Sequence, residues 1–288
     1  MSVSFPKITI VTPSFNQGQF IEQTIMSVLD QQYPNLEYIV IDGGSTDGTV
    51  RILQKYDHYI DFWQSAPDQG QVDAINKGLA RSSGEILAWL NSDDTYQPGA
   101  LGEVADLLRH HPDIDVISGR CRVWYGDHRD LILEPSSLRS FVDFLKVGSG
   151  WMNLQLIVQP EAFFRRTGFE KVGELRSDAP LSFDFCLWIE MARAGCRFHS
   201  VDRHWANLRR HSAQKTADID KGYAEVILAA WQYLLSDWDR LGPQARDVAN
   251  DLFCAVGRLN ERNKAQLETY RESTSYRLGR AITRLKRW

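Results

Sequence analysis

The sequence predicts an α/β fold with a doubly wound, mostly parallel sheet, and three observations support that prediction. Short β-branched runs alternate along the chain with segments whose apolar residues recur at helical spacing. Polar loops follow the apolar runs, as expected where parallel strands need crossover helices. The chain has 288 residues, of which 43% are hydrophobic, so it is long enough to bury a large core.

The first part of the chain reads as successive strand and helix pairs. Residues 8–11 form a β-branched run, and residues 20–29 carry apolar side chains at helical spacing. The same pattern predicts strands over 38–41, weakly over 60–63, over 86–90 and from 116–117, with helices over 50–56, 72–80 and 101–108. We expect the sheet to occupy about the first 120 residues.

The pattern changes in the second part of the chain. Residues 121–133 alternate like an antiparallel hairpin, 154–158 fit an added strand, and 181–194 are helical. This part is expected to cover the crevice at the sheet edge rather than to extend the sheet. From residue 218 onward, the spacing of apolar residues predicts two amphipathic helices separated near Gly242 and Pro243.

Composition excludes several classes of partner and of site. The formal net charge is −4, so the chain lacks the basic field that would hold nucleic acid. Four scattered cysteines have no spacing suited to zinc, and we expect all four to be reduced core residues: Cys121, Cys186, Cys196 and Cys254. The amino terminus lacks a signal-peptide pattern and no apolar stretch approaches the ~20 residues of a spanning helix, which predicts a cytoplasmic protein.

Two adjacent carboxylates, Asp93 and Asp94, follow the apolar run at 86–90. Acids at the carboxyl end of a parallel strand lie in the crevice where such sheets bind ligands, and Mg²⁺ and Mn²⁺ prefer oxygen ligands. The pair therefore suits a metal-bound diphosphate. The alternative is an acidic turn in which one of the two caps the next helix.

A third acid, Asp42, follows the strand predicted over 38–41 and precedes two glycines. An acid in this position can accept hydrogen bonds from a base or a ribose. The alternative is a glycine-rich turn with Asp47 as a helix cap. We favour binding for Asp42 and capping for Asp47.

Three ordered motifs together resemble family-2 glycosyltransferases: Thr-Pro-Ser-Phe-Asn at 12–16, Asp-Gly-Gly-Ser-Thr-Asp-Gly-Thr at 42–49 and Asn-Ser-Asp-Asp at 91–94. The resemblance spans residues 8–216 and implies a GT-A fold that uses a metal ion and a nucleotide-sugar donor. It also implies that Asp42 reads the base and that a set of residues in the first motif lines the nucleotide pocket: Thr12, Pro13, Ser14 and Asn16.

The third motif matches the family's D-x-D metal site with one departure. The resemblance makes Asp93 the ligand of Mn²⁺ or Mg²⁺, assisted by Asp94, with Ser92 on the donor side. Asn91 stands where many relatives have the first Asp. It removes one negative charge, which weakens metal binding modestly but leaves an amide oxygen for the ribose or a metal-bound water.

The segment 67–78 resembles the donor-side segment of a subset of the family. Asp68 and Asp73 are candidates for hydrogen bonds to the base or to sugar hydroxyls, and Lys77 belongs to the same donor-side set. A capped surface helix is the alternative, and the residues alone leave both open.

The segment 181–195 resembles the family's acceptor-side helix, in which an acid near the start acts as the base. Asp184 is the matching position, and Phe183 and Cys186 leave it as the one carboxylate there. An acid in aromatic surroundings is desolvated, which raises its basicity and suits it to proton removal. Helix capping is the alternative, and we favour catalysis.

The segment 208–216 resembles the Arg-x-His-x-x-x-Lys-Thr run that closes the catalytic domain in relatives, with Arg209 and His211 at matching positions. A cation near a diphosphate neutralises charge on the leaving group, and a histidine can complete the ligand shell of a metal. A plain surface histidine is the alternative.

The predicted organisation is a GT-A catalytic domain over 1–217, with a nucleotide-binding half (1–120) and an acceptor-side half (121–217), then a helical extension over 218–270 and a basic amphipathic tail over 271–288. Such a tail can lie on an anionic membrane surface, which would make the protein peripheral to the inner face of the membrane. The alternative is a docking helix or the contact of a homo-oligomer.

We predict an inverting, metal-dependent glycosyltransferase that moves a sugar from a nucleoside diphosphate sugar, with a UDP-sugar as the expected donor, to a hydroxyl of a glycan or lipid-linked acceptor in cell-surface polysaccharide synthesis. One alternative is a nucleotidyltransferase that makes a nucleotide-sugar, although residues 12–19 lack the Lys or Arg of a triphosphate loop. A dehydrogenase would need a G-x-G-x-x-G after the first strand, and the sequence has none there. Asn91 and Phe183 suggest the other alternative, a non-catalytic nucleotide-sugar-binding protein.

Overall fold

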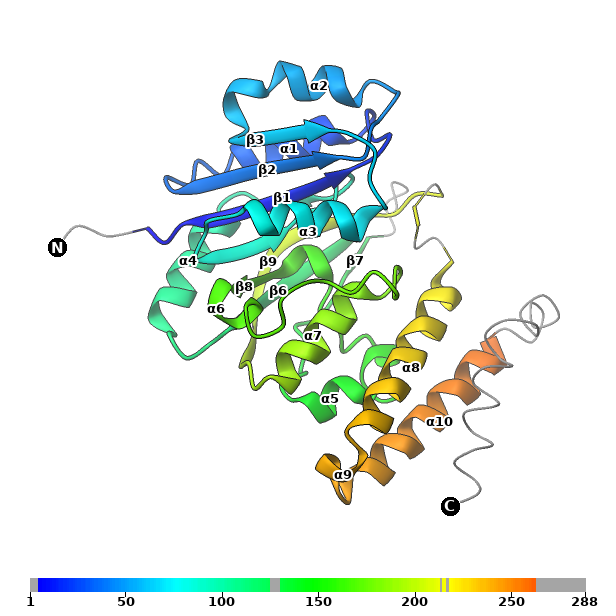
Figure 1. Ribbon diagram of the computed structural model, residues 1–288. Coiled ribbons are helices and arrows are strands. Elements are labelled where there is room, and N and C mark those ends of the chain that lie inside the picture. Colours follow the sequence, from blue (N-terminus) through cyan, green and yellow to red (C-terminus); the bar gives the residue numbers. More distant parts are fainter. Residues whose placement is uncertain (1–4, 125–129, 213, 216–217, 263–288) are drawn as a thin grey trace.

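The computed structural model describes residues 5–124, 130–212, 214–215 and 218–262, and these build a nine-stranded mixed sheet (Figure 1). The strand order is β3-β2-β1-β4-β8-β6-β9-β5, and β7 pairs with β6 outside this path. The strands are β1 (Ile8–Ser14), β2 (Leu36–Asp42), β3 (Phe62–Ser65), β4 (Ile86–Trp89), β5 (Thr95–Tyr96), β6 (Val116–Trp124), β7 (Leu131–Ile132), β8 (Ala162–Arg165) and β9 (Phe198–Arg209). Strands β1 to β4 are mutually parallel, so their carboxyl ends share one edge of the sheet.

Helices cover both faces of the sheet. They are α1 (Ile21–Leu29), α2 (Thr49–Lys55), α3 (Gln71–Arg81), α4 (Ala100–His110), α5 (Phe141–Leu145), α6 (Arg166–Phe169), α7 (Phe183–Arg193), α8 (Ile219–Ser236), α9 (Trp238–Leu241) and α10 (Gln244–Arg262), with 3-10 turns at Asp57–Tyr59, Trp151–Asn153 and Gln159–Glu161. Alternate residues of each strand point to opposite faces. Ile10 and Ala88 join a core with α1, α2 and α4, whereas Val11 and Trp89 join a second core with α3, α7 and α8.

Helix α3 lies unusually close to β1, and Gly78 makes that approach possible. A Cβ at this position would lie 2.3 Å from Cγ1 of Val11. We expect Gly78→Ala to destabilise the fold by about 1–3 kcal/mol, because the overpacked contact must be relieved by moving the helix or the strand. Chemical denaturation of the purified protein measures this change.

Gly102 provides a matched control for that substitution. It also lies within a helix, but a Cβ there meets no atom within 4 Å. Gly102→Ala should therefore stabilise the protein by up to about 1 kcal/mol through helix propensity alone. If both substitutions change stability by the same amount, close packing against Val11 is not the reason that glycine occupies position 78.

The carboxyl-terminal helices dock on the second half of the chain. Helices α8 and α10 lie side by side, and α8 packs against α7 (Figure 1). The carboxylate of Asp251 in α10 accepts hydrogen bonds from the backbone N–H groups of Gly148 (2.6 Å) and Ser149 (2.8 Å). Arg258 donates to the carbonyl oxygen of Gly148 at 2.9 Å. The predicted pair of helices is therefore present on either side of the Gly242 and Pro243 turn, with the short α9 before that turn.

The sheet extends further along the chain than the sequence pattern predicts. Strands β8 and β9 enter the same sheet, so it is not confined to the first part of the chain. The 12-residue β9 has a weak pattern because six of its residues are only partly buried, and its pairing with β6 is irregular between Ser118 and Cys121. The added strand predicted over 154–158 is wrong. Leu154 adopts a left-handed φ of 62° after one 3-10 turn, and Gln159 starts another.

Other predictions have mixed outcomes. The predicted hairpin over 121–133 is present as the antiparallel pair β6 and β7. Cys121, Cys186 and Cys196 are buried free thiols, but Cys254 is exposed, because it lies on the outer side of α10. Within the described ranges, every helix is too short or too polar to cross a lipid bilayer. The predicted tail over 271–288 lies outside the described residues.

Candidate functional site

The loops after β1 and β2 are joined by hydrogen bonds at the carboxyl edge of the sheet. Asn16 adopts a left-handed φ of 52°, and its Oδ1 accepts from the N–H of Thr46 at 2.9 Å. The N–H of Asn16 donates to Oγ of Ser45 at 2.6 Å. The N–H of Gly43 donates to the carbonyl oxygen of Ser14 at 2.8 Å. Residues of the first two motifs therefore form one continuous surface.

Asp47 fixes the start of α2 within this surface. Its Oδ1 accepts from the N–H of Thr49 at 2.9 Å, and its Oδ2 accepts from the N–H of Gly18 at 2.8 Å. Burial alone would raise the pKa of Asp47. The hydrogen bonds from Thr49 and Gly18 stabilise the ionised carboxylate and lower the pKa below its ordinary value. Gly48, rather than Asp47, stands at the N-cap of α2 and no side chain caps the helix there, so the capping role predicted for Asp47 is wrong in position: Asp47 binds the N–H of Thr49 from one residue before the N-cap.

Asp42 lies beneath the surface, fully buried at the end of β2. Its carboxylate accepts from the N–H of Ser45 at 2.8 Å, from Oγ of Ser45 at 2.5 Å and from Oγ of Ser65 at 2.6 Å. It also accepts from the N–H of Gly44 at 3.2 Å. Asp42 therefore holds the loop after β2 in its conformation through these hydrogen bonds. Its contact with a base stays a prediction.

The segment after β3 brings one acid to the same place. A Cβ on Gly43 would lie 2.9 Å from Oδ2 of Asp68, so the Asp68 carboxylate lies directly over that glycine. Oδ1 of Asp68 accepts from the N–H of Gly70 at 2.8 Å. Only a glycine at position 43 leaves room for this approach. Asp68 thus joins the group of residues at the ends of β1 and β2.

Asp73 and Lys77 form a different arrangement. Lys77 donates to Oδ2 of Asp73 at 2.7 Å along the outside of α3, and the side chains are 42% and 29% exposed, respectively. The N–H of Gln69 donates to the same oxygen at 3.0 Å. The bonds from Lys77 and Gln69 lower the pKa of Asp73. These contacts are those of a surface helix whose N-cap is Gly70, without a side-chain cap, and a donor contact from either residue stays a prediction.

The loop after β4 carries the third motif and is hydrogen-bonded to the start of α3 and to the end of β9. Oδ1 of Asn91 accepts from Nε2 of Gln71 at 2.8 Å, and Nδ2 of Asn91 donates to Asp94 at 3.3 Å. Ser92 is buried, at 4% exposure. Asn91 therefore links the start of α3 to the acid pair, a bridge that needs both halves of an amide.

Asp94 is buried and ties the end of β4 to the end of β9. Its Oδ1 accepts from the N–H of Arg209 at 2.9 Å, and its backbone oxygen accepts from Oγ1 of Thr24 at 2.8 Å. Burial, then the charge of Asp93, raises the pKa of Asp94 well above its ordinary value. Neither acid caps the next helix, because Gly99 stands at the N-cap of α4. The assisting metal role of Asp94 stays a prediction.

Asp93 faces His211 across the gap between the β4 loop and the segment after β9. Oδ2 of Asp93 lies 3.0 Å from Nε2 of His211, and their side chains are 13% and 17% exposed, respectively. Nε2 of Gln214 donates to the same oxygen at 3.2 Å. The ring of Phe20 packs on the imidazole with centroids 4.7 Å apart. Two predicted metal ligands are therefore brought together by strands that are distant in sequence.

A carboxylate oxygen and an imidazole nitrogen are both donors that Mn²⁺ accepts, and Mg²⁺ accepts the oxygen readily. The donor pair therefore fits a divalent ion, with Asp93 and His211 as the two side chains to hold it. The described part of the chain contains no cluster of three or more His, Cys, Asp or Glu side chains that would enclose such an ion. Substrate oxygens would have to supply further ligands, as diphosphates do for Mg²⁺.

Arg209 is held rigidly beside this pair. Its guanidinium lies between the rings of Phe20 and Trp124, at 4.8 and 4.6 Å from their centroids. Its Nε donates to the carbonyl oxygen of Asp93 at 3.1 Å, and its Nη2 donates to Gln23. Burial lowers its pKa, and Asp93 and Asp94 oppose that shift. Arg209 therefore adds a fixed positive charge at the edge of the site.

Asp184 lies in the first turn of α7, and its neighbour Phe183 contacts the end of β4. The ring of Phe183 packs on that of Trp89, the last residue of β4, with centroids 6.0 Å apart. Ser182 stands at the N-cap of α7, so Asp184 does not cap the helix. Burial raises the pKa of Asp184 to about 6, against the hydrogen bond that it accepts from the N–H of Phe185. A carboxyl group with this pKa is suited to accepting a proton near neutral pH.

Several residues of this site carry no pattern that distinguishes them in the sequence. Phe20, Gln23 and Trp124 surround Arg209, and Gln214 contacts Asp93. The pairing of β6 with β9 opposes Trp124 and Arg209, whereas Phe20 and Gln23 come from the start of α1, so these residues meet only in the folded chain. Gln214 lies within the 208–216 run that resembles the family, and its place in that run is the sequence signal that could have identified it.

Comparisons with known proteins identify related glycosyltransferases. The model of the family described as glycosyl transferase family 2 matches residues 9–173. An uncharacterized glycosyltransferase of Mycobacterium tuberculosis is 30% identical over 189 residues, which are 63% of this chain and 67% of that protein. The putative teichuronic acid biosynthesis glycosyltransferase TuaG of Bacillus subtilis is 41% identical over 106 residues, 36% of this chain and 42% of TuaG.

Solved structures share the fold at low identity. Residues 1–349 of Staphylococcus aureus TarS, in complex with UDP-GlcNAc, superpose with a TM-score of 0.61 at 16% identity, covering 77% of this chain and 66% of that one. The mannosyltransferase PcManGT of Pyrobaculum calidifontis, in complex with GDP-Man and Mn²⁺, gives a TM-score of 0.59 at 17% identity, covering 91% and 76%. The predicted GT-A fold is confirmed. On its sequence match and its fold, the chain belongs to glycosyl transferase family 2.

Proposed function

We propose that this family member is an inverting, metal-dependent enzyme that moves a sugar from a nucleoside diphosphate sugar to a hydroxyl of a glycan or lipid-linked acceptor. One observation carries the proposal: two acids, one in the loop after β4 and one at the start of α7, lie in contrasting environments. Asp93 faces an imidazole, whereas burial raises the pKa of Asp184 to about 6. Acids whose environments differ in this way take different roles in a reaction.

The proposed roles follow from those environments. Asp93 and His211 would hold a divalent ion, which when bound supplies a Lewis acid for the departing diphosphate. Asp184 takes the proton of the acceptor hydroxyl as its oxygen attacks the anomeric carbon. Arg209 adds positive charge on the leaving-group side. One base and one stabilised leaving group give a single displacement, and a single displacement inverts the anomeric configuration.

The comparisons support the type of donor and the setting. TarS was solved with UDP-GlcNAc and PcManGT with GDP-Man and Mn²⁺. TuaG is named for teichuronic acid biosynthesis. We therefore place the protein in cell-surface polysaccharide synthesis with a UDP-sugar as the first donor to test. Peripheral membrane contact through residues 271–288 belongs to the same proposal, and binding of the full chain to anionic vesicles tests it.

A thermal-shift series tests the donor. UDP-GlcNAc, other UDP-sugars and GDP-mannose are each added with and without Mn²⁺. A bound donor at about 100 times its Kd stabilises the fold by about 2.7 kcal/mol, because it binds the native state alone. That corresponds to a rise in Tm on the order of 5–10 °C for a domain of this size. We expect the rise to need Mn²⁺.

The same series separates the alternatives. A nucleotidyltransferase would be stabilised by a nucleoside triphosphate more than by any nucleotide-sugar. A non-catalytic binding protein would show the shift with a nucleotide-sugar but no release of nucleoside diphosphate over time. No shift with any nucleotide-sugar would contradict the proposal.

A further inference from the structure

Helix α8 of the carboxyl-terminal extension reaches the loop that precedes Asp184. Oε2 of Glu225 in α8 accepts a hydrogen bond from the backbone N–H of Leu181 at 2.7 Å. Leu181 comes three residues before Asp184 and directly before the N-cap of α7. A charged acceptor makes this a strong hydrogen bond to a backbone donor. One side chain of the extension therefore fixes the entry to the helix that carries the proposed base.

The same loop is held at its other end. Nη1 of Arg176 donates to Oη of Tyr233 in α8 at 3.0 Å, and Arg176 also binds both oxygens of Asp178, at 2.9 and 2.6 Å. Before that, Asn76 of α3 exchanges two hydrogen bonds with the backbone of Leu175, at 3.0 and 2.9 Å. Elements from both parts of the chain thus restrain residues 175–181.

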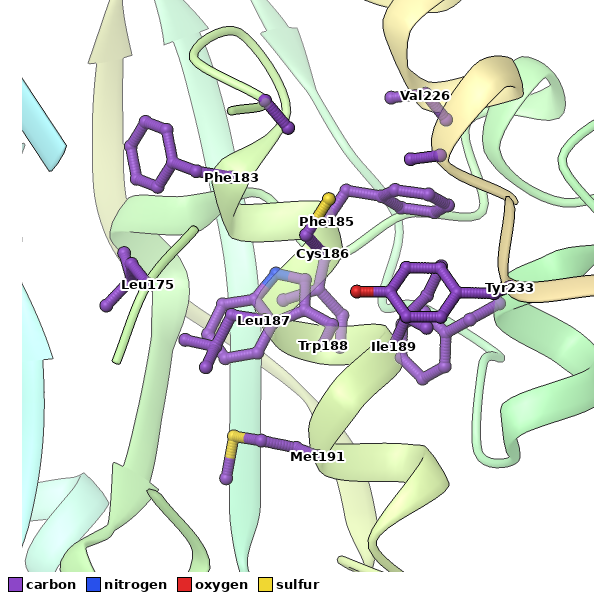
Figure 2. Packing of buried hydrophobic residues seen from close by; sticks show 14 of the residues in the cluster. Leu175, Phe183, Phe185, Cys186, Leu187, Trp188, Ile189, Met191, Val226 and Tyr233 are labelled. Atoms are coloured by element: carbon purple, nitrogen blue, oxygen red, sulfur yellow. The ribbon is translucent and has the colours of Figure 1, made fainter. Parts of the chain in front are cut away.

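Apolar packing places α8 firmly against α7. Figure 2 shows Val226 and Tyr233 of α8 beside Phe185 and Ile189 of α7, and all four side chains are buried in one core. Val226 is adjacent to Glu225 in sequence. The position of the Glu225 carboxylate is therefore set by a packed helix rather than by a free loop.

Glu225 also acts on Asp184 through its charge. Burial is the main cause of the raised pKa of Asp184, and the negative charge of Glu225 raises it further. Dehydration of the Lys215 ammonium lowers its pKa, and the charge of Glu225 opposes that shift. Arg176 and Asp178 of the loop are further charged groups near this end of α7, since both act on the neighbouring Cys186.

We propose that Glu225 is a positioning residue for sugar transfer, and that the helical extension is a working part of the acceptor side rather than an appended module. Glu225 acts by holding the backbone of Leu181, and so the start of α7, in place. The proposal rests on the role proposed above for Asp184. Glu225 lies outside the region 9–173 that matches the family model, so that match does not imply this role.

Two substitutions separate the hydrogen bond from the charge. Glu225→Gln keeps an oxygen that can accept from Leu181 but removes the charge, and Glu225→Ala removes both. Hydrogen exchange of the full chain, followed by mass spectrometry of peptides covering 175–187, reports the bond itself. We expect faster exchange at Leu181 in Glu225→Ala and little change in Glu225→Gln. Unchanged exchange in Glu225→Ala would overturn the proposal.

Kinetics then test the consequence for the reaction, with UDP release from UDP-GlcNAc or GDP release from GDP-mannose in Mn²⁺ as the assay. Glu225→Ala should lower kcat by about 10–100-fold, as for other residues that orient a reacting group, with the KM for the donor unchanged. Glu225→Gln should retain most of kcat, and the acidic limb of its pH profile should move to lower pH, because Asp184 loses a neighbouring negative charge. A purely structural role would lower the Tm of Glu225→Ala while leaving its kcat and the acidic limb of both pH profiles unchanged, and this result would overturn the proposal.

Glu174→Gln is the matched control, because Glu174 is an exposed acid just before the same loop. It should leave exchange at Leu181 and the pH profile unchanged. Asp184→Asn shows whether a negative result concerns Glu225 alone or the role proposed for Asp184. If that variant keeps wild-type activity, Asp184 is not the base and the catalytic part of the proposal fails, whatever the exchange data show. If it is inactive while Glu225→Ala is fully active, only the role of Glu225 fails.

Discussion

Asp93→Asn is expected to lower kcat for sugar transfer by about 10²–10³-fold, the loss typical when stabilisation of developing charge is removed, because Asp93 is proposed to hold the ion that would neutralise the departing diphosphate. The substitution keeps the size of the side chain and the backbone oxygen that accepts from Arg209. It removes the carboxylate charge that faces His211 at 3.0 Å. Steady-state release of nucleoside diphosphate measures kcat, and a Mn²⁺ titration measures the apparent affinity for the ion, which should weaken as well.

Asp106→Asn is the control for that experiment. Asp106 is 63% exposed on α4, where it pairs with Arg109 on the protein surface. Its loss changes the net charge by the same amount as the loss of Asp93, so a general effect of charge would appear in both variants. Equal activity in both variants, at every Mn²⁺ concentration, would contradict a metal role for Asp93.

The sequence was sufficient to predict the first half of this site because local pattern determines it. A buried strand that ends in polar residues has few other positions for its loop, and the parallel pairing of β1 with β2 and β4 brings those ends together. The placement of Asn16, Asp42 and Asp93 at one edge followed from this rule. What the pattern did not show is that Asp42 uses its oxygens within the loop. That depends on Ser65, which belongs to another strand.

The second half of the site depends on long-range contacts that no local pattern shows. Strand β9 is partly exposed and bulged, so its alternation is weak, yet it positions Arg209 and leads to His211. The rings that hold Arg209 come from the N-cap of α1 and from β6, more than eighty residues away in sequence. Glu225 was missed for the same reason, since its role follows from a helix packed against α7 and from a hydrogen bond to a backbone group.

Asp184→Asn is expected to lower kcat by about 10²–10⁴-fold, the usual contribution of a general base, while donor binding remains intact. Asparagine can still accept the hydrogen bond that the N–H of Phe185 donates at 2.8 Å, so the start of α7 should keep its geometry. The Tm rise caused by the donor with Mn²⁺ should therefore match that of the wild type. Loss of donor binding together with activity would point instead to a collapse of the site.

The same variant should be more stable than the wild type at about pH 8, and the sign follows from linkage. Asp184 has a pKa of about 6 in the folded chain against an ordinary value of 3.8, so the folded state holds its proton more tightly than the unfolded state does. The stability that the protonated Asp184 contributes is complete below the unfolded pKa of 3.8, and it is lost as the pH rises through the folded pKa of about 6. Asparagine cannot ionise, so the variant should gain about 1–3 kcal/mol over the wild type above the upper value and little near pH 3–4. Urea unfolding across this range measures the difference, and a gap between the two proteins that does not change with pH would show that Asp184 is not desolvated. The proposed base is thus expected to lower the stability of the fold near neutral pH, which follows from keeping a carboxylate partly out of water.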